Sequence, residues 1–260
     1  MAHLLESVRE GRLLHLTLNR PEKRNALNID LCRALIDSFE AAARDRAVTA
    51  ILLTANGPAF CAGMDLAEIA EGANSNIINA LHDQIFTIGA RLEKPLVLAV
   101  DGPALGGGTG LVANGHVVVA SPQATFGLTE IRLGLWPFLV FRAVAGALGE
   151  RRTVELALTG RTFSAAEALQ LGLLHHIADD PAAKGREIAL QLSEASPTAL
   201  QSGLSFVQQV RGLPWDRAGE VARLVRNDLF ASDDFAEGIQ AFLEKRRPVW
   251  PSLANLETKP

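Results

Sequence analysis

The sequence predicts an α/β fold in which strands and helices alternate through about the first half of the chain and helices dominate the rest. Two apolar segments, TAILLT (49–54) and PLVLAV (95–100), have the length and composition of buried strands. Each runs into a glycine-bearing loop that precedes a helix. From Phe138 onward, apolar residues recur mainly at helical spacing. This order is typical of an α/β core with a helical C-terminal part.

The elements follow one another from the N-terminus. Residues 3–8 and 13–18 have the pattern of two strands of a hairpin, joined by a Glu-Gly turn. A helix is expected from Asn28, as its N-cap, to about Arg46. Further helices are predicted at about 76–92, 182–211, 217–231 and 233–245, and further short strands at 117–120 and 124–127.

The composition favours a small-molecule partner. The 260 residues carry a net charge of -4 with both signs spread along the chain, which excludes a basic nucleic-acid surface and a polybasic membrane patch. The longest apolar runs are too short to span a bilayer. Cys32 and Cys61 lack a CxxC or His/Cys cluster around them, which argues against a disulfide framework and structural zinc. We therefore expect a cytoplasmic protein without a metal site.

Two glycine loops lie where α/β proteins favour ligand sites, because N–H groups at a helix start have no intrahelical partner. In AFCAGMDL (59–66), Asp65 and Glu68 have the D-x-x-E form of an N-cap with a reciprocal acid. Such a cap would hold the N–H of Met64 outward. In DGPALGGGTG (101–110), consecutive glycines allow close backbone approach to a ligand. Both loops are also typical of tight packing corners, and GxxxxGK[ST] and GxGxxG are absent.

The chain resembles the crotonase superfamily, also called the enoyl-CoA hydratase/isomerase family, in five segments. They are NRPEKRNALN, AFCAGMDL, DGPALGGGTG, ATFGLTEIRLGLWP and SDDFAEGIQAFLEKRRPVW, and they span nearly the whole chain. The resemblance implies a spiral of ββα units that forms an acyl-CoA-binding core over residues 1–195, and a helical trimerisation region over 196–260. It also implies a homotrimer or a dimer of trimers, with coenzyme A as part of the substrate and no separate cofactor.

The resemblance also implies roles for individual residues. Met64 and Gly107 match the two backbone N–H donors of an oxyanion hole, which stabilise the enolate of a thioester substrate. Lys23 and Arg24 are candidates for pairing with phosphates, or are ordinary solvated cations. The residues implied to contact the substrate are Ala26, Ala62, Gly63, Gly106, Trp136 and Phe138.

The carboxylates indicate which reaction to expect. Hydratases of this family use two acids, one to activate water and one to deliver a proton to the α-carbon; the matching positions here are Gly110 and Glu130. One carboxylate is sufficient to move a proton from C2 to C4, so the sequence favours double-bond isomerisation. Apolar neighbours are expected to raise the pKa of Glu130, which suits a base. The alternatives are a hydratase that uses Glu130 and a water held by other groups, an inactive acyl-CoA-binding protein, and a solvent-facing Glu130 at a helix start.

Other residues of the motifs have structural interpretations. Phe138 stands where dienoyl isomerases and aryl-CoA dehalogenases place an Asp, which disfavours both reactions. With Trp136, it is expected to narrow the acyl pocket or to pack in the core. His82 is expected to be a packed or surface histidine, His116 to fill a structural niche and Cys61 to be a small buried residue. The sequence has no GxSxG motif or ordered Ser/His/Asp set that would indicate a nucleophilic hydrolase.

Overall fold

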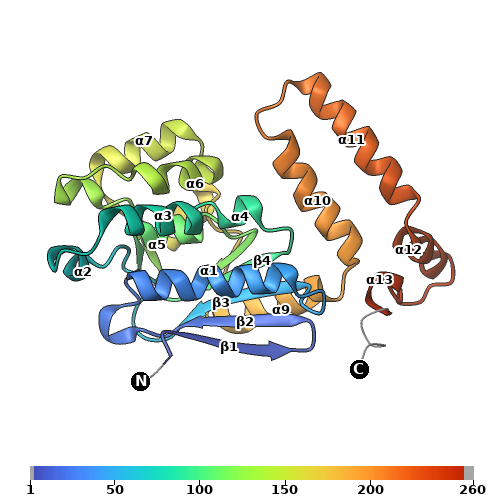
Figure 1. Cartoon of the computed structure of the whole chain (residues 1–260), viewed down its shortest axis with the longest axis horizontal. Helices are drawn as coiled ribbons and strands as arrows, with labels where there is room; N and C mark the ends of the chain where they lie inside the picture. The colour runs from blue at the N-terminus through green and yellow to red at the C-terminus, as the bar shows by residue number, and fades with distance from the viewer. Residues whose placement is uncertain (1–2, 255–260) are drawn as a thin grey trace.

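The computed structural model, described over residues 3–254, contains a six-stranded sheet and a three-stranded sheet (Figure 1). The first strand pair is antiparallel and the other neighbours in the large sheet are parallel. In spatial order its strands are β1 (Leu5–Glu10), β2 (Leu13–Leu18), β3 (Ala50–Ala55), β4 (Leu96–Val100), β6 (Val117–Ala120) and β9 (His176–Ile177).

Central strands β3 and β4 are apolar except for Thr54, because both of their faces are covered. Side chains alternate between the two faces, so Ile51 and Leu53 pack into the main core with α1 (Ile29–Arg44). The intervening Leu52 packs on the other side, against α9 (Pro181–Ser193). The expected N-cap at Asn28 is confirmed, because its side chain accepts a hydrogen bond from the Leu31 N–H.

The smaller sheet connects the two glycine segments to the region of Glu130. It consists of β5 (Ala104–Leu105), β7 (Thr125–Gly127) and β8 (Thr162–Ser164), and β7 ends three residues before Glu130. The Thr109 hydroxyl lies 2.7 Å from the Ala104 carbonyl and 3.0 Å from the Gly127 carbonyl. This buried contact fixes the glycine segment against the strand that leads to Glu130.

Shorter helices surround these sheets. Where one helix was expected over residues 76–92, the structure has two, because the Thr87 hydroxyl bonds to the carbonyls of Asp83 and Gln84 at the break. These two are α3 (Ser75–Ile85) and α4 (Ile88–Arg91). The other helices between α1 and residue 172, and the short helix before α1, are η1 (Pro21–Lys23), α2 (Leu66–Ala70), α5 (Gly107–Val112), η2 (Glu130–Leu133), α6 (Phe138–Leu148), α7 (Glu150–Thr159) and α8 (Ala165–Leu171).

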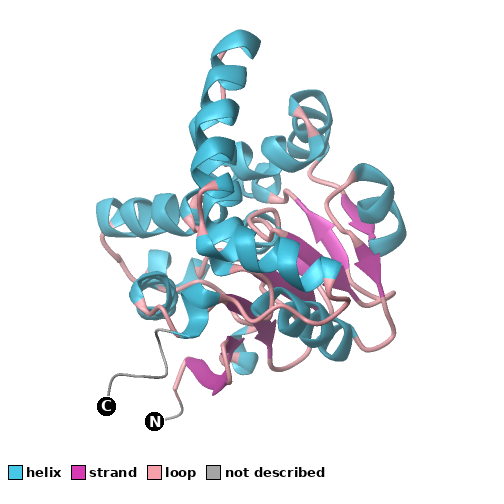
Figure 2. Cartoon of the chain, turned by 90° about the vertical axis from the view of Figure 1, so that its right-hand side faces the viewer, coloured by secondary structure: helices cyan, strands magenta, loops and turns pink. Residues whose placement is uncertain are grey.

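The C-terminal part is helical, as expected. It comprises α10 (Pro197–Val210), α11 (Trp215–Phe230), α12 (Asp233–Leu243) and α13 (Pro251–Ala254). The stretch predicted as one helix over 182–211 is divided at Pro197, where Ser196 caps the new helix. Neither α10 nor α11 has a fully buried residue, and their hairpin stands clear of the strands in Figure 1. Figure 2 views the chain from the side of these helices. No helix within residues 3–254 is long and apolar enough to cross a membrane.

Candidate active site

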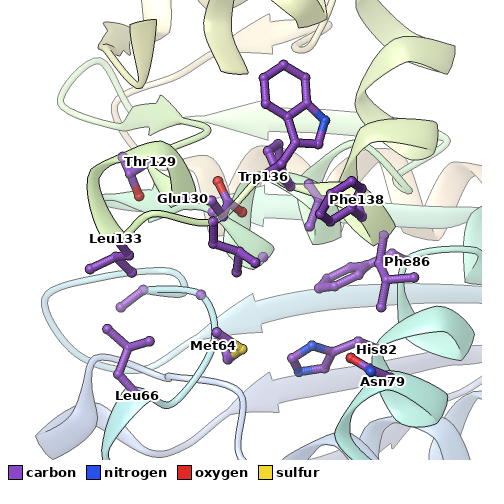
Figure 3. A pocket seen from close by; sticks show the side chains of 18 residues that line it. Met64, Leu66, Asn79, His82, Phe86, Thr129, Glu130, Leu133, Trp136 and Phe138 are labelled. Atoms are coloured by element: carbon purple, nitrogen blue, oxygen red, sulfur yellow. The ribbon is translucent and has the colours of Figure 1, made fainter. Parts of the chain in front are cut away.

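A cavity of about 240 Å³ lies where the two glycine segments, α3 and the region of Glu130 meet (Figure 3). Its walls come from residues 62–66, 79–86, 106–107 and 129–140. Most of the lining side chains are apolar, so a polar group on this wall meets little competition from water. The polar side chains of the lining are Asn79, His82, Thr129 and Glu130.

Met64 presents a free backbone donor to this cavity. The segment around Leu27 pairs with it in parallel, because the Leu27 N–H donates to the Gly63 carbonyl at 2.7 Å and the Asp65 N–H donates to the Leu27 carbonyl at 3.1 Å. The Met64 N–H, between these bonds, has no partner within residues 3–254. Gly63 has a φ of +93°, and a Cβ there would lie 2.7 Å from the Leu105 carbonyl oxygen, so the turn requires glycine.

Gly107 provides the second free donor. The glycine triplet was expected to form a loop before a helix, but the structure places Gly107 as the first residue of α5 and Gly106 as its N-cap. The first N–H groups of a helix have no intrahelical partner, and the Gly107 N–H has none among the described residues. A Cβ at Gly63 would lie 3.2 Å from the Gly107 nitrogen, so the two segments are in contact. Two free N–H groups therefore border one cavity.

Asp65 anchors the segment that carries Met64. Its carboxylate accepts hydrogen bonds from the N–H groups of Ala67 and Glu68, as predicted for an N-cap. The predicted reciprocal contact is wrong, because the Glu68 carboxylate instead accepts from the Ile29 N–H at the start of α1. The sequence did not indicate the second partner of Asp65, which is Arg20, at 2.5 Å.

The Arg20–Asp65 pair is largely buried and joins three chain segments. The two side chains are 13% and 7% exposed, and the same guanidinium nitrogen donates to the Ala26 carbonyl at 3.0 Å. Burial by itself would raise the pKa of Asp65, but hydrogen bonds from Arg20 and from the backbone outweigh it and leave this pKa lowered. Asp65 is therefore an ionised structural cap.

Glu130 reaches the cavity from η2, next to the second glycine segment. A Cβ at Gly106 would lie 3.1 Å from Glu130 Oε1, which places the carboxylate beside the start of α5. Its Oε2 is buried without a hydrogen-bond partner within the described residues. Burial raises the pKa of Glu130, because desolvation disfavours the charged form. The expected rise is confirmed, and the solvent-facing alternative is wrong.

Gly110 is packed too tightly to be replaced by an acid without rearrangement. A Cβ at Gly110 would lie 2.7 Å from Cγ1 of Val140 and 3.2 Å from Cδ1 of Phe86. Gly110 itself is outside the cavity lining. Among the described residues, Glu130 is the only carboxylate that lines this cavity.

The residues predicted to contact substrate fall into two groups. Ala62, Gly63, Gly106, Trp136 and Phe138 all line the cavity, together with Met64, Gly107 and Glu130. Trp136 is half-buried and its ring lies 6.3 Å from that of Phe141, whereas Phe138 is 70% exposed at the rim. Ala26 is outside the lining, one residue before the Leu27–Met64 bridge, so its contact with coenzyme A stays a prediction.

Two of the remaining polar residues are accounted for by packing. His116 Nδ1 accepts from the Leu96 N–H, and its Nε2 lies 2.9 Å from the Gly89 carbonyl, which fits the structural niche expected for it. Burial raises the pKa of Cys61 to about 12, so its thiol stays protonated and inert. His82 is buried as a packed histidine would be, yet it also lines the cavity.

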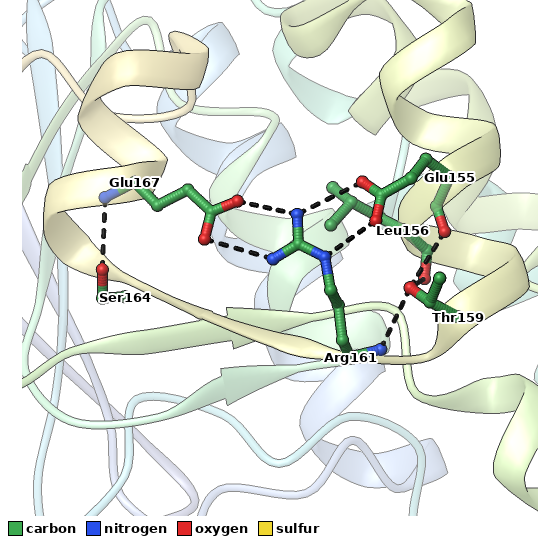
Figure 4. A network of polar contacts seen from close by, with 6 residues as sticks. All are labelled: Glu155, Leu156, Thr159, Arg161, Ser164 and Glu167. Atoms are coloured by element: carbon green, nitrogen blue, oxygen red, sulfur yellow. Dashed lines mark hydrogen bonds and ion pairs between the residues drawn. The ribbon is translucent and has the colours of Figure 1, made fainter.

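Arg161 links α7 and α8 through two acidic partners (Figure 4). Its guanidinium makes paired contacts with Glu155 on α7, at 2.8 and 3.2 Å, and with Glu167 on α8, at 2.7 and 3.1 Å. Arg161 directly precedes β8, which pairs with β7 through Thr162 and Gly127. Paired geometry makes such a network more rigid than single surface ion pairs. Glu155 and Glu167 thereby hold the chain between α7 and β8, next to the segment that carries Glu130.

Two free N–H groups beside a buried carboxylate in an apolar cavity are typical of sites that stabilise an oxyanion. The family model "Enoyl-CoA hydratase/isomerase" matches residues 9–253, and the chain belongs to this family. The resemblance and the crotonase fold predicted from the sequence are thereby confirmed.

Named relatives agree with this assignment. The chain is 37% identical over 253 residues to the 2,3-dehydroadipyl-CoA hydratase of Escherichia coli strain K12, covering 95% of this chain and 98% of the relative. It is 33% identical over 252 residues to the enoyl-CoA hydratase EchA19 of Mycobacterium tuberculosis, covering 92% and 93%. A solved enoyl-CoA hydratase from Mycobacterium smegmatis matches with a TM-score of 0.89 and 30% identity, covering 96% of this chain and 99% of that one.

Proposed function

We propose that this acyl-CoA enzyme converts 3-enoyl-CoA into 2-enoyl-CoA. Glu130 removes a proton from C2, the resulting enolate oxygen accepts hydrogen bonds from the N–H groups of Met64 and Gly107, and Glu130 returns the proton to C4. The double bond moves from C3–C4 to C2–C3, with no gain or loss of atoms. Preorganised donors of this kind each typically contribute about 100- to 1000-fold in rate.

The observation that carries the proposal is the solitary carboxylate. Water addition by the family's two-acid route needs a second acid at position 110, and there Val140 and Phe86 occupy the space around a glycine. Proton transfer between two carbons needs one base that reaches both. The raised pKa of Glu130 supports this role, because a base is most effective when its pKa approaches the working pH.

A panel of coenzyme A thioesters tests the proposal. We expect the enzyme to convert 3-hexenoyl-CoA into 2-hexenoyl-CoA and to add water to crotonyl-CoA much more slowly. Chromatography of the products measures both reactions. Fast hydration of crotonyl-CoA with little isomerisation would contradict the proposal. Tight binding of the whole panel without any turnover would favour the inactive acyl-CoA-binding protein.

A hydratase is the second candidate, and the names of the relatives favour it. Proteins at 33% and 37% identity over most of this chain are named hydratases. In that case Glu130 would deliver the proton to the α-carbon, and the attacking water would be held by other groups of the cavity. The two candidates require Glu130 in opposite protonation states at the start of the reaction, so they have opposite pH dependence.

We also propose that the C-terminal helices form the contact between subunits of a homotrimer or a dimer of trimers. Large apolar side chains on α11 and α12 are exposed in the single chain, among them Leu224 at 66%, Phe242 at 82% and Leu243 at 73%. Exposed apolar patches of this kind mark association sites. Sedimentation should give a multiple of three chains for the wild type and smaller species for Phe242→Glu, and a monomeric wild type would contradict this proposal.

A further inference from the structure

His82 is a buried side chain whose hydrogen-bonding capacity is directed at the candidate active site. It lies on α3, is 6% exposed and lines the same cavity as Glu130. One face of its ring packs against Phe86, with the ring centroids 5.3 Å apart. Neither ring nitrogen bonds to a protein group within residues 3–254, and neither is among the enclosed unpaired atoms there, so both remain accessible. The imidazole can therefore hydrogen-bond to a group that enters the cavity.

Asn79 extends this polar feature toward the mouth of the cavity. It precedes His82 by three residues on α3, so both side chains project from one face of the helix. Figure 3 shows Glu130 and Thr129 on one side of the cavity, and His82 and Asn79, with Met64 beside them, on the other. A thioester whose carbonyl rests at Met64 and Gly107 would therefore have Glu130 on one side and a second polar wall on the other.

The charge state of this wall restricts what it can bind. Burial lowers the pKa of His82 to about 4, so the imidazole is neutral near pH 7 and offers one donor and one acceptor. No Lys or Arg occurs in the cavity lining that the structure describes. A carboxylate on the acyl chain would thus lose its hydration without gaining a cation, which is costly in an apolar cavity.

We propose that His82, with Asn79, binds an uncharged hydroxyl or keto oxygen carried by the acyl chain beyond C3. The substrate class is then a short acyl-CoA with a neutral oxygen substituent. A cavity of about 240 Å³ is smaller than the ~300–1,000 Å³ typical of sites for drug-sized ligands, which favours a short chain. This inference rests on the proposed acyl-CoA function but not on the identity of the reaction.

Equilibrium binding of saturated five-carbon thioesters tests this assignment independently of isomerisation. Calorimetry would compare pentanoyl-CoA with 4-oxopentanoyl-, 5-hydroxypentanoyl-, 3-hydroxypentanoyl- and glutaryl-CoA. We expect the wild type to bind the 4-oxo or 5-hydroxy ligand about 3- to 10-fold more tightly than pentanoyl-CoA, the range of one net hydrogen bond. Glutaryl-CoA, which carries a carboxylate, should bind most weakly.

Two His82 variants separate hydrogen bonding from packing. His82→Phe keeps a ring against Phe86 and should abolish the preference for the oxygenated ligand, whereas His82→Gln keeps a donor and an acceptor and should retain part of it. His176→Phe, at an exposed histidine on β9, is the matched control and should bind like the wild type. Thermal unfolding would show whether each variant is folded. If His82→Phe is not folded, the ligand series on the wild type still decides the question.

Three results would overturn the assignment. Equal binding of pentanoyl-CoA and the 4-oxo and 5-hydroxy ligands by the wild type would show that no such oxygen is recognised. If the wild type preferred only 3-hydroxypentanoyl-CoA, His82 and Asn79 would bind the oxygen that water adds at C3 and not an oxygen farther along the chain. Tightest binding of glutaryl-CoA would show that the wall receives a charged group. Because none of these measurements requires isomerisation, a failure of the proposed reaction would be seen separately, in the turnover panel.

Discussion

The cavity has one wall built from backbone and another built from side chains, and the two differ in what fixes them. The backbone wall, at Met64 and Gly107, depends on chain geometry: a glycine turn, a parallel bridge to Leu27 and a helix start. The side-chain wall consists of Glu130 and His82, which lie on opposite sides of the cavity, and it depends on residue type and burial. The backbone wall can serve any thioester reaction, so the specific reaction must depend on the side-chain wall.

Replacing the base should have the largest effect on activity. Glu130→Gln keeps the shape of the carboxylate but cannot accept a proton, so kcat for 3-enoyl-CoA should fall about 100- to 10,000-fold. Binding of a saturated acyl-CoA should change little, because the backbone wall is intact. Glu150→Gln, at the exposed start of α7, is the control and should be as active as the wild type. Undiminished turnover by Glu130→Gln would remove Glu130 from the mechanism.

Removing the anchor of the backbone wall should reduce both stability and rate. Asp65→Ala leaves Arg20 buried without its partner and removes the N-cap of α2, which should lower the free energy of unfolding by about 3–5 kcal/mol. Urea unfolding measures this loss. Asp180→Ala is the matched control, because Asp180 caps α9 from an exposed position through one hydrogen bond to the Ala183 N–H.

The control should lose only about 1 kcal/mol, the typical value of a cap. The difference between the two variants then measures the buried ion pair. If Asp65→Ala were no less stable than Asp180→Ala, the pair with Arg20 would not be the anchor of this segment. In the folded Asp65→Ala protein, kcat should also fall, since the Met64 N–H would no longer be held in position.

Adding a methyl group at Gly110 should destabilise the protein by about 1–3 kcal/mol, because the new Cβ overlaps Val140. Gly110→Ala combined with Val140→Ala should recover part of that loss, since the second change makes room for the first. Gly146→Ala, in the last turn of α6 with open space where a Cβ would lie, is the control and should stabilise by about 0.4–1 kcal/mol. Thermal unfolding of the four proteins checks these values, and a neutral Gly110→Ala would show that position 110 can accept a side chain.

The backbone wall was easier to predict from sequence than the side-chain wall. Apolar strands, the Asn28 cap and the glycine segments are local patterns, and the structure places them close to where they were expected. The Glu68 contact with Ile29 and the packing of Val140 on Gly110 join residues that are far apart in sequence, and no local pattern encodes them. The presence of His82 on the cavity wall likewise depends on how α3 packs.

The pH dependence of catalysis distinguishes the two roles of Glu130. As a base for isomerisation, Glu130 must start ionised, and its folded pKa lies above the ordinary value of 4.5. kcat/KM should therefore fall tenfold per pH unit as the pH drops below that raised pKa. As the proton donor of a hydratase, Glu130 must start protonated, and kcat/KM would instead fall as the pH rises above it. Binding of a saturated acyl-CoA across the same pH range controls for loss of affinity.

The same shift predicts a small effect on stability with a fixed sign. Folded Glu130 holds its proton to higher pH than the unfolded chain does, so ionising it costs stability as the pH rises from its ordinary pKa through the raised one. Glu130→Gln removes this cost and should be at least as stable as the wild type near pH 7, with the two proteins converging below the ordinary pKa. Urea unfolding at several pH values measures the difference. A wild type more stable than Glu130→Gln near neutral pH would mean that the carboxylate has a stabilising partner, and that it is not a desolvated base.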